Sequence, residues 1–146
     1  MGLFDAIDSS GSGLQAERLR MDVTSENLAN AQTTKGADGQ PYRRKSVVLQ
    51  EAGASGTTFA SILAGQQSGP THGVKVAGIV EDSSALKRIY DPGHPDADKD
   101  GYVTMPNVNT VTEMTDLISA SRAYEANVTA MQTAKTMFSK TLDLLR

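Results

Sequence analysis

The stretch Thr110–Leu145, TVTEMTDLISASRAYEANVTAMQTAKTMFSKTLDLL, carries the strongest periodic signal in the chain. Ten positions at alternating spacings of three and four residues form one stripe, and eight of them are apolar. The stripe comprises Met114, Leu117, Ser121, Tyr124, Val128, Met131, Lys135, Phe138, Leu142 and Leu145. No glycine or proline interrupts the segment. The pattern therefore predicts one continuous helix of about 50 Å, at a rise of 1.5 Å per residue, with a coiled-coil seam.

The ends of this segment agree with a helix, and its seam indicates a particular partner. Thr110 or Thr112 can cap the start, and Lys140 lies near the end, where it complements the helix dipole. Ser121 and Lys135 are polar at positions that the seam would bury. Polar residues at such positions lower stability and select register or partner, so we expect this helix to pack against one specific surface.

The amino-terminal region shows a second, weaker stripe. Ile7, Leu14, Met21 and Leu28 recur every seven residues, but the positions three residues further on are not large and apolar. Gly11 and Gly13 each cost about 1 kcal/mol relative to alanine inside a helix. A helix with such a narrow apolar face is marginal alone, so we expect it to become fully ordered only against a partner.

Between the two helical segments the composition changes. Thr33–Pro41 and Ala52–Gly73 are rich in small and polar residues and are typical of loops. Tyr42–Leu49, Gly73–Val80 and the shorter Leu86–Tyr90 have the character of strands. The expected fold is therefore mainly α with a small antiparallel β module, in which long amino- and carboxy-terminal helices pair as a coiled coil.

The segment Asp96–Asn107, DADKDGYVTMPN, begins like an EF-hand calcium loop, with carboxylates at its first, third and fifth positions and glycine at the sixth. The twelfth position, which should be a bidentate glutamate, is Asn107. Prolines and glycine in the preceding YDPGHP exclude an entering helix. We interpret the segment as an acidic turn and predict no metal site there.

Composition argues against several other classes of protein. The chain has no cysteine, and His72 and His94 show no ligand spacing, so we expect neither a metal nor a cofactor. No catalytic constellation is present, and we expect no enzyme activity. The net charge of −3 gives no nucleic-acid footprint, and we assign Arg43, Arg44 and Lys45 no binding role.

The amino terminus, MGLFDAIDSSGSG, has no lysine or arginine and no apolar core, so it does not read as a secretory signal. No apolar run approaches the roughly 20 residues that span a bilayer, and we expect no membrane insertion. If the protein leaves the cytoplasm, another export system must carry it.

Two regions of the chain resemble the axial proteins of the bacterial flagellar rod and hook. The first is SGLQAERLRMDVTSENLANAQTT, Ser12–Thr34, with Asn27-Leu28-Ala29-Asn30-Ala31 at its centre. The second, Gly73–Leu145, contains YDPGHPDAD, GYVTMPNVN and SRAYEANV, which are similar to proximal-rod members of the family. Glu51–Pro70 shows no family motif.

The resemblance implies a structural subunit of the proximal rod of the flagellar basal body, assembled helically into a tube that crosses the periplasm and transmits torque from motor to hook. It implies export through the flagellar type III apparatus without a cleaved signal. The implied partners are copies of the chain itself and the rod proteins FlgB, FlgF, FlgG and FliE.

The resemblance also implies a division of the chain. Residues 1–32 and 110–146 would form the two helices of an inner axial domain, and residues 33–109 an outer β and loop module with a connecting segment. The expected assembly residues are the apolar members of the Thr110–Leu145 stripe and six residues of the first helix. The six are Ile7, Leu14, Met21, Asn27, Leu28 and Asn30. Another flagellar rod or hook subunit is the nearest alternative, and a calcium-binding regulator is a distant one.

Overall fold

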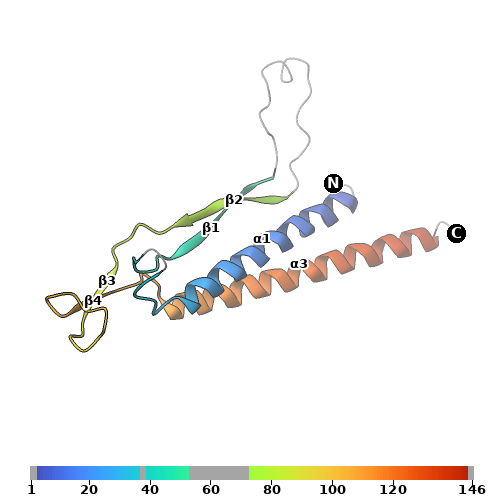
Figure 1. Ribbon diagram of the computed structural model, residues 1–146. Coiled ribbons are helices and arrows are strands. Elements are labelled where there is room, and N and C mark those ends of the chain that lie inside the picture. The colour runs from blue at the N-terminus through green and yellow to red at the C-terminus, as the bar shows by residue number, and fades with distance from the viewer. Residues whose placement is uncertain (1–2, 37–38, 53–72, 145–146) are drawn as a thin grey trace, which may run out of the picture.

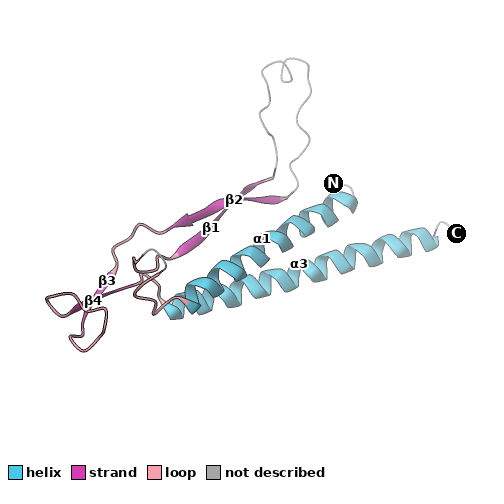
Figure 2. Cartoon of the chain, in the orientation of Figure 1, coloured by secondary structure: helices cyan, strands magenta, loops and turns pink. Residues whose placement is uncertain are grey.

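The computed structural model describes residues 3–36, 39–52 and 73–144. Within these ranges the chain forms two long helices with four short strands between them (Figures 1 and 2). In chain order they are α1 (Leu3–Ala29), β1 (Lys45–Glu51), β2 (Val74–Glu81), β3 (Lys87–Tyr90), β4 (Tyr102–Met105) and α3 (Thr110–Leu144). The prediction of a mainly α chain with a small β module is confirmed.

The two helices lie side by side and run in opposite directions (Figure 1). Asn27 near the end of α1 bonds to Glu113 near the start of α3. Gly13 faces Asn127, because a Cβ at position 13 would lie 3.0 Å from Asn127 Nδ2. At the far end, α3 continues past the first turn of α1 (Figure 1).

The fully buried apolar residues of the two helices are alanines and one valine. Ala16 and Val23 of α1 are buried, as are Ala120 and Ala134 of α3. Among the described elements α3 packs on α1 alone, so this is the face that α1 covers. The predicted seam is therefore wrong at part of its length: Ala120 and Ala134 are buried there, whereas the neighbouring predicted positions Ser121 and Lys135 are not.

The strands form two separate antiparallel ribbons, not the single sheet that the sequence predicts. In the first, β1 and β2 pair from Lys45 opposite Glu81 to Glu51 opposite Val74, with an irregularity after Val48. In the second, β3 and β4 pair from Lys87 opposite Met105 to Tyr90 opposite Tyr102. The interpretation of Asp96–Asn107 as an acidic turn is wrong at its carboxy-terminal half, because strand β4 lies there.

The ribbons separate because the chain is held where it leaves β2. The Asp82 carbonyl accepts hydrogen bonds from Asn107 Nδ2 at 3.2 Å and from Arg43 at 3.3 Å. Asp82 Oδ1 also accepts from the amide of Ser84 at 2.8 Å. These contacts direct the chain away from β2, and β3 then pairs with β4.

The β1–β2 ribbon lies along α1 and is bonded to it near both ends (Figure 1). Near the amino-terminal end of α1, Ser12 Oγ accepts a hydrogen bond from the amide of Val74 at 3.0 Å. Gly73 precedes this contact with φ of 132°, and a Cβ there would lie 2.6 Å from Ser12 Oγ, so the close approach needs glycine. Helix α1 is thus covered by α3 and by the ribbon, which explains how a narrow apolar stripe forms an ordered helix.

Candidate functional site

Among the described residues, the two buried polar side chains, Asn27 and Glu113, lie where α1, β1 and α3 meet. The side chain of Asn27 is 1% exposed and makes four hydrogen bonds. Its Oδ1 accepts from Tyr42 Oη and from the amide of Lys45, both at 2.9 Å. Its Nδ2 donates to the Lys45 carbonyl at 2.8 Å and to Glu113 Oε2 at 3.0 Å. The Asn27 side chain therefore bonds to the backbone of Lys45 as a neighbouring strand would, and it connects β1 to α3.

Glu113 brings a charge into this junction. It is 1% exposed, and its second oxygen, Oε1, accepts a hydrogen bond from Arg44 Nε at 2.6 Å. This bond raises the pKa of Arg44 above its ordinary value, against the opposing effect of partial burial. Arg44 also reaches Asp116 at 3.4 Å, and its amide donates to Asn107 Oδ1 at 2.8 Å. The buried carboxylate is therefore fully paired, as a buried charge must be.

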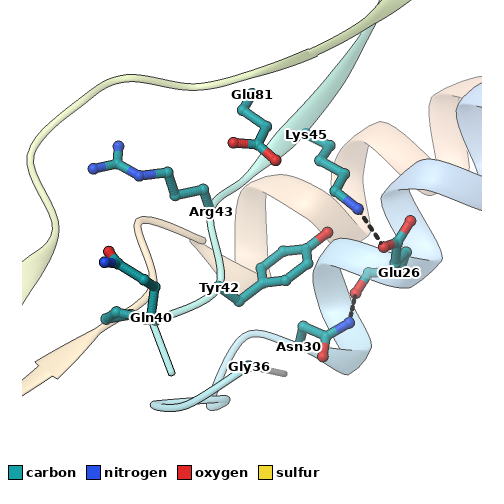
Figure 3. A pocket seen from close by; sticks show the side chains of 9 residues that line it. Glu26, Asn30, Gly36, Gln40, Tyr42, Arg43, Lys45 and Glu81 are labelled. Atoms are coloured by element: carbon teal, nitrogen blue, oxygen red, sulfur yellow. Dashed lines mark hydrogen bonds and ion pairs between the residues drawn. The ribbon is translucent and has the colours of Figure 1, made fainter. Parts of the chain in front are cut away.

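A polar cleft of about 570 Å³ opens beside the junction (Figure 3). The Tyr42 ring forms part of its wall, and the ion pair between Lys45 Nζ and Glu26 Oε1, at 2.7 Å, closes one side. Burial, and then the charges of Glu26, Glu113 and Glu81, raise the pKa of Tyr42 to about 12. The phenol stays neutral at physiological pH and donates to Asn27, so its role here is structural.

Asn30, the second asparagine of the motif, ends α1. Its Nδ2 donates to the Glu26 carbonyl at 2.9 Å, and its Oδ1 accepts from Thr33 Oγ1 at 3.2 Å. The Glu26 carbonyl also accepts from the backbone amide of Asn30 at 3.0 Å, so the side chain adds a second hydrogen bond to a carbonyl of the last helical turn. The two asparagines therefore shape the junction within one chain: Asn27 holds the strand and Asn30 ends the helix.

The calcium-like stretch is part of a β-hairpin. Residues 91–101 connect β3 to β4, and Gly101 takes the left-handed conformation, with φ of 77°. The Asp96 carboxylate is held by Lys35 Nζ at 2.8 Å and by Thr34 Oγ1 at 2.7 Å, and these bonds, in that order, keep its pKa below the ordinary value. Over the described ranges, no group of three His, Cys, Asp or Glu side chains is placed to hold a metal ion.

The expected assembly residues of α3 fall into two groups. Met114 and Leu142 are each 52% exposed and Phe138 is 40% exposed, so the contact with α1 leaves them available to another surface. The others are partly buried: Leu117, Tyr124, Val128 and Met131. Met131 faces α1, because a Cβ on Gly11 would lie 3.8 Å from its Cε. Leu145 lies outside the described residues.

In α1, the expected apolar residues are neither fully buried nor exposed. Ile7, Leu14, Met21 and Leu28 all have intermediate exposure. Sequence reasoning overlooked three exposed apolar residues of α3, namely Val111, Ile118 and Met137. Val111, Met114 and Ile118 together form an exposed apolar strip near the start of α3, which we call the outer strip.

The ion pair of the junction was also missed. From the sequence, Arg44 is assigned no binding role and Glu113 is not singled out. Sixty-nine residues separate the two, and no local spacing in the sequence signals their contact. Within the described part of the chain, neither helix combines the length and apolar character needed to cross a bilayer.

Comparison with known proteins gives consistent matches at both ends and over the whole chain. Residues 7–37 match the model of the flagella basal body rod protein family, and residues 99–144 match that of the flagellar basal body rod FlgEFG protein C-terminal family. The flagellar basal-body rod protein FlgC of Bacillus subtilis is 50% identical over 99% of both chains. The FlgC proteins of Borreliella burgdorferi and Salmonella typhimurium are 46% and 45% identical, over 100% and 99% of this chain and 99% and 98% of their own.

Identity at this level over nearly the full length of each relative, with α1 and α3 both inside the matched regions, establishes the relationship. The chain belongs to the FlgC family of flagellar basal-body rod proteins.

Proposed function

We propose that this chain is a structural subunit of the proximal rod, which assembles helically with its neighbours into the tube that transmits torque from motor to hook. The near full-length likeness to FlgC proteins supports this role most directly. The role needs no catalytic group. Its partners are further copies of the chain and other rod proteins, with FlgB, FlgF, FlgG and FliE as candidates.

The exposed apolar residues of α3 support an assembly surface. Val111 is 71% exposed, Met114 52% and Ile118 55%, and they lie on one side of the helix at spacings of three and four. The contact with α1 leaves these three side chains exposed, so another surface can cover them. Burying three such side chains stabilises a contact by roughly 1.5–3 kcal/mol each.

In this proposal the two helices, residues 1–32 and 110–146, form an inner axial domain in which helices of adjacent subunits pack as a coiled coil. Residues 33–109 form an outer module, which the Asn27 and Glu113 junction fixes to the helices. The subunit reaches its place in the periplasmic part of the basal body through the flagellar type III export apparatus, without a cleaved signal.

Replacing one residue of the outer strip tests the assembly surface. Met114→Asp should leave the isolated chain folded, because Met114 is already half in solvent, and should prevent rod assembly, because a charge would enter the contact. Ser119→Asp, also exposed on α3 but on a different side of the helix, is the matched control. The readouts are circular dichroism of the purified chains and motility of a deletion strain that carries each variant. Motility with Met114→Asp equal to that with Ser119→Asp would contradict the assigned surface.

A further inference from the structure

Each β-ribbon leaves a strand edge without a partner among the described residues. A two-stranded ribbon is at best marginally stable in water, and a free edge is a template for another strand. The outer edge of β1 is covered where Asn27 bonds to both backbone groups of Lys45. None of the described residues covers the carboxy-terminal end of β2 or the edge of β3, whose four residues are all exposed.

The hydrogen-bond pattern identifies the backbone groups on the β2 edge. The amide of Asp82 donates to the Arg44 carbonyl at 2.7 Å, so these two residues form a hydrogen-bonded pair. Such pairs alternate along an antiparallel ladder, so Val80 also points its backbone groups at β1. The amide and carbonyl groups of Ile79 and Glu81 therefore point outward.

The same reasoning applies to β3. The amide of Asp91 donates to the Gly101 carbonyl at 2.9 Å, which makes this a hydrogen-bonded pair of the second ribbon. By alternation, Ile89 is bonded to β4, and the backbone groups of Arg88 and Tyr90 point outward. Arg88 stacks 5.0 Å from the Tyr102 ring and has no ion pair among the described residues.

The two open edges are complementary in register as well as in chemistry. When β2 is placed antiparallel to β3 with outward groups facing, Glu81 lies opposite Arg88 and Ile79 opposite Tyr90. Between them, Val80 lies opposite Ile89. These four side chains are about half exposed or more. The exposed fractions are 50% for Ile79, 52% for Val80, 49% for Ile89 and 64% for Tyr90. Opposite-charge and aromatic–aliphatic cross-strand pairs each stabilise a sheet.

One chain does not make this pairing itself, because the contacts of Asp82 with Arg43, Asn107 and Ser84 lead the two strands apart. We propose that β2 of one copy pairs edge to edge with β3 of a neighbouring copy, which gives a four-stranded sheet across the boundary between subunits. The contact joins different surfaces of the two copies, so it can continue from one subunit to the next. The inference rests on the proposed rod function and names strand edges through which copies meet.

Disulfide trapping tests the contact directly, since the chain contains no cysteine. One tagged chain carries Val80→Cys and a second, differently tagged chain carries Ile89→Cys, both expressed in a deletion strain. In the proposed register these residues form a non-hydrogen-bonded pair with Cα atoms about 4.5 Å apart, which suits a disulfide. Oxidised basal bodies should contain a dimer with both tags. Val48→Cys, 43% exposed on β1, replaces Val80→Cys as the control and should give none.

Charge reversal separates contact between copies from contact within one chain. Glu81→Arg and Arg88→Glu each place like charges opposite one another, so each variant alone should lose motility. Co-expression of the two should restore it, because alternating copies regain opposite charges at every contact. A pairing within one chain would stay repulsive in both variants, and co-expression would fail.

The outcomes distinguish this inference from the proposed function. A mixed dimer, or restored motility on co-expression, supports the intermolecular sheet. If the cells are motile but their basal bodies contain no more mixed dimer than the Val48→Cys control, the intermolecular sheet is excluded and the rod function stands. A disulfide formed within a single chain carrying both cysteines, without mixed dimer, also overturns it. If the cysteine strains build no basal bodies, the charge-reversal test decides: failure of Glu81→Arg and Arg88→Glu to restore motility on co-expression excludes the intermolecular sheet.

Discussion

Asn27→Ala is predicted to destabilise the isolated chain more than any exposed substitution in the same helix. It removes four hydrogen bonds: two with Lys45, one with Tyr42 and one with Glu113. Bonds between neutral groups contribute about 1 kcal/mol each and a bond to a charged group about 2 kcal/mol. Lys45 and Tyr42 are partly exposed and regain some hydration, whereas Glu113 does not. The expected loss in the free energy of unfolding is therefore about 4 kcal/mol.

Urea unfolding followed by circular dichroism measures this loss. With a slope of about 2 kcal/mol/M, the midpoint should fall by about 2 M at unchanged slope. Asn30→Ala is the matched control, because Asn30 belongs to the same helix end but is partly exposed and makes two bonds, so its cost should be about 1 kcal/mol. Asn27→Asp keeps the shape but replaces the donor with a carboxylate oxygen that faces Glu113 Oε2 and the Lys45 carbonyl, so it should also destabilise the chain. A midpoint for Asn27→Ala within 0.5 M of that for Asn30→Ala, on the order of 1 kcal/mol, would refute the reasoning.

Three further predictions concern the helix pair and the hairpin. Gly11→Ala should stabilise α1 by about 1 kcal/mol, because the added Cβ meets only Met131 Cε, at 3.8 Å. Gly13→Ala should not stabilise it, because the added Cβ would lie 3.0 Å from Asn127 Nδ2. Equal shifts in the thermal midpoint of the two variants would contradict this contrast. In the dilute monomer the first turns of α1 and the last turns of α3 should exchange amide hydrogens fastest, and uniform strong protection measured by mass spectrometry would exclude it. Lys35→Ala should raise the pKa of Asp96, read by NMR titration. Because the folded-state pKa of Asp96 is lowered, its ion pair with Lys35 stabilises the fold at pH values above the ordinary carboxyl pKa. This contribution is lost as the pH falls through the lowered value. An Asp96 titration unchanged by Lys35→Ala would show that the pair does not form.

The helices could be predicted from the sequence, but their contact could not. The predicted carboxy-terminal helix, from position 110 to 145, agrees closely with Thr110–Leu144, because a long periodic pattern without glycine or proline determines one element locally. The predicted helix contact differs from the observed one because the periodic pattern is defined by large apolar residues. Two closely packed helices instead select small residues such as Ala120 and Ala134, which an apolar stripe of larger side chains does not reveal.

The strands were placed to within a few residues, whereas their partners were not. A continuous sheet was the natural expectation, since β2 and β3 are separated by only a short connection. The separation depends on Asn107, which bonds to Asp82 from 25 residues away. Strand β4 was missed because its four residues follow an acidic stretch rich in turn-forming residues.

The polar junction could be only partly anticipated. The resemblance singled out Asn27, but its burial and its four bonds depend on tertiary contacts with Lys45 and Glu113. Neither Arg44 nor Glu113 has a local signature that distinguishes a buried, paired charge from a solvated one. This distinction needs the fold, because a charge is tolerated inside only when its partner is already in place.

Deletion of the gene in the source bacterium tests the central claim most directly. An in-frame deletion would be examined by electron microscopy for hooks and filaments, with the intact gene returned as the control. The account predicts that hooks and filaments disappear in the deletion strain and reappear with the gene. Normal hooks in the deletion strain would contradict the role of this chain as a rod subunit.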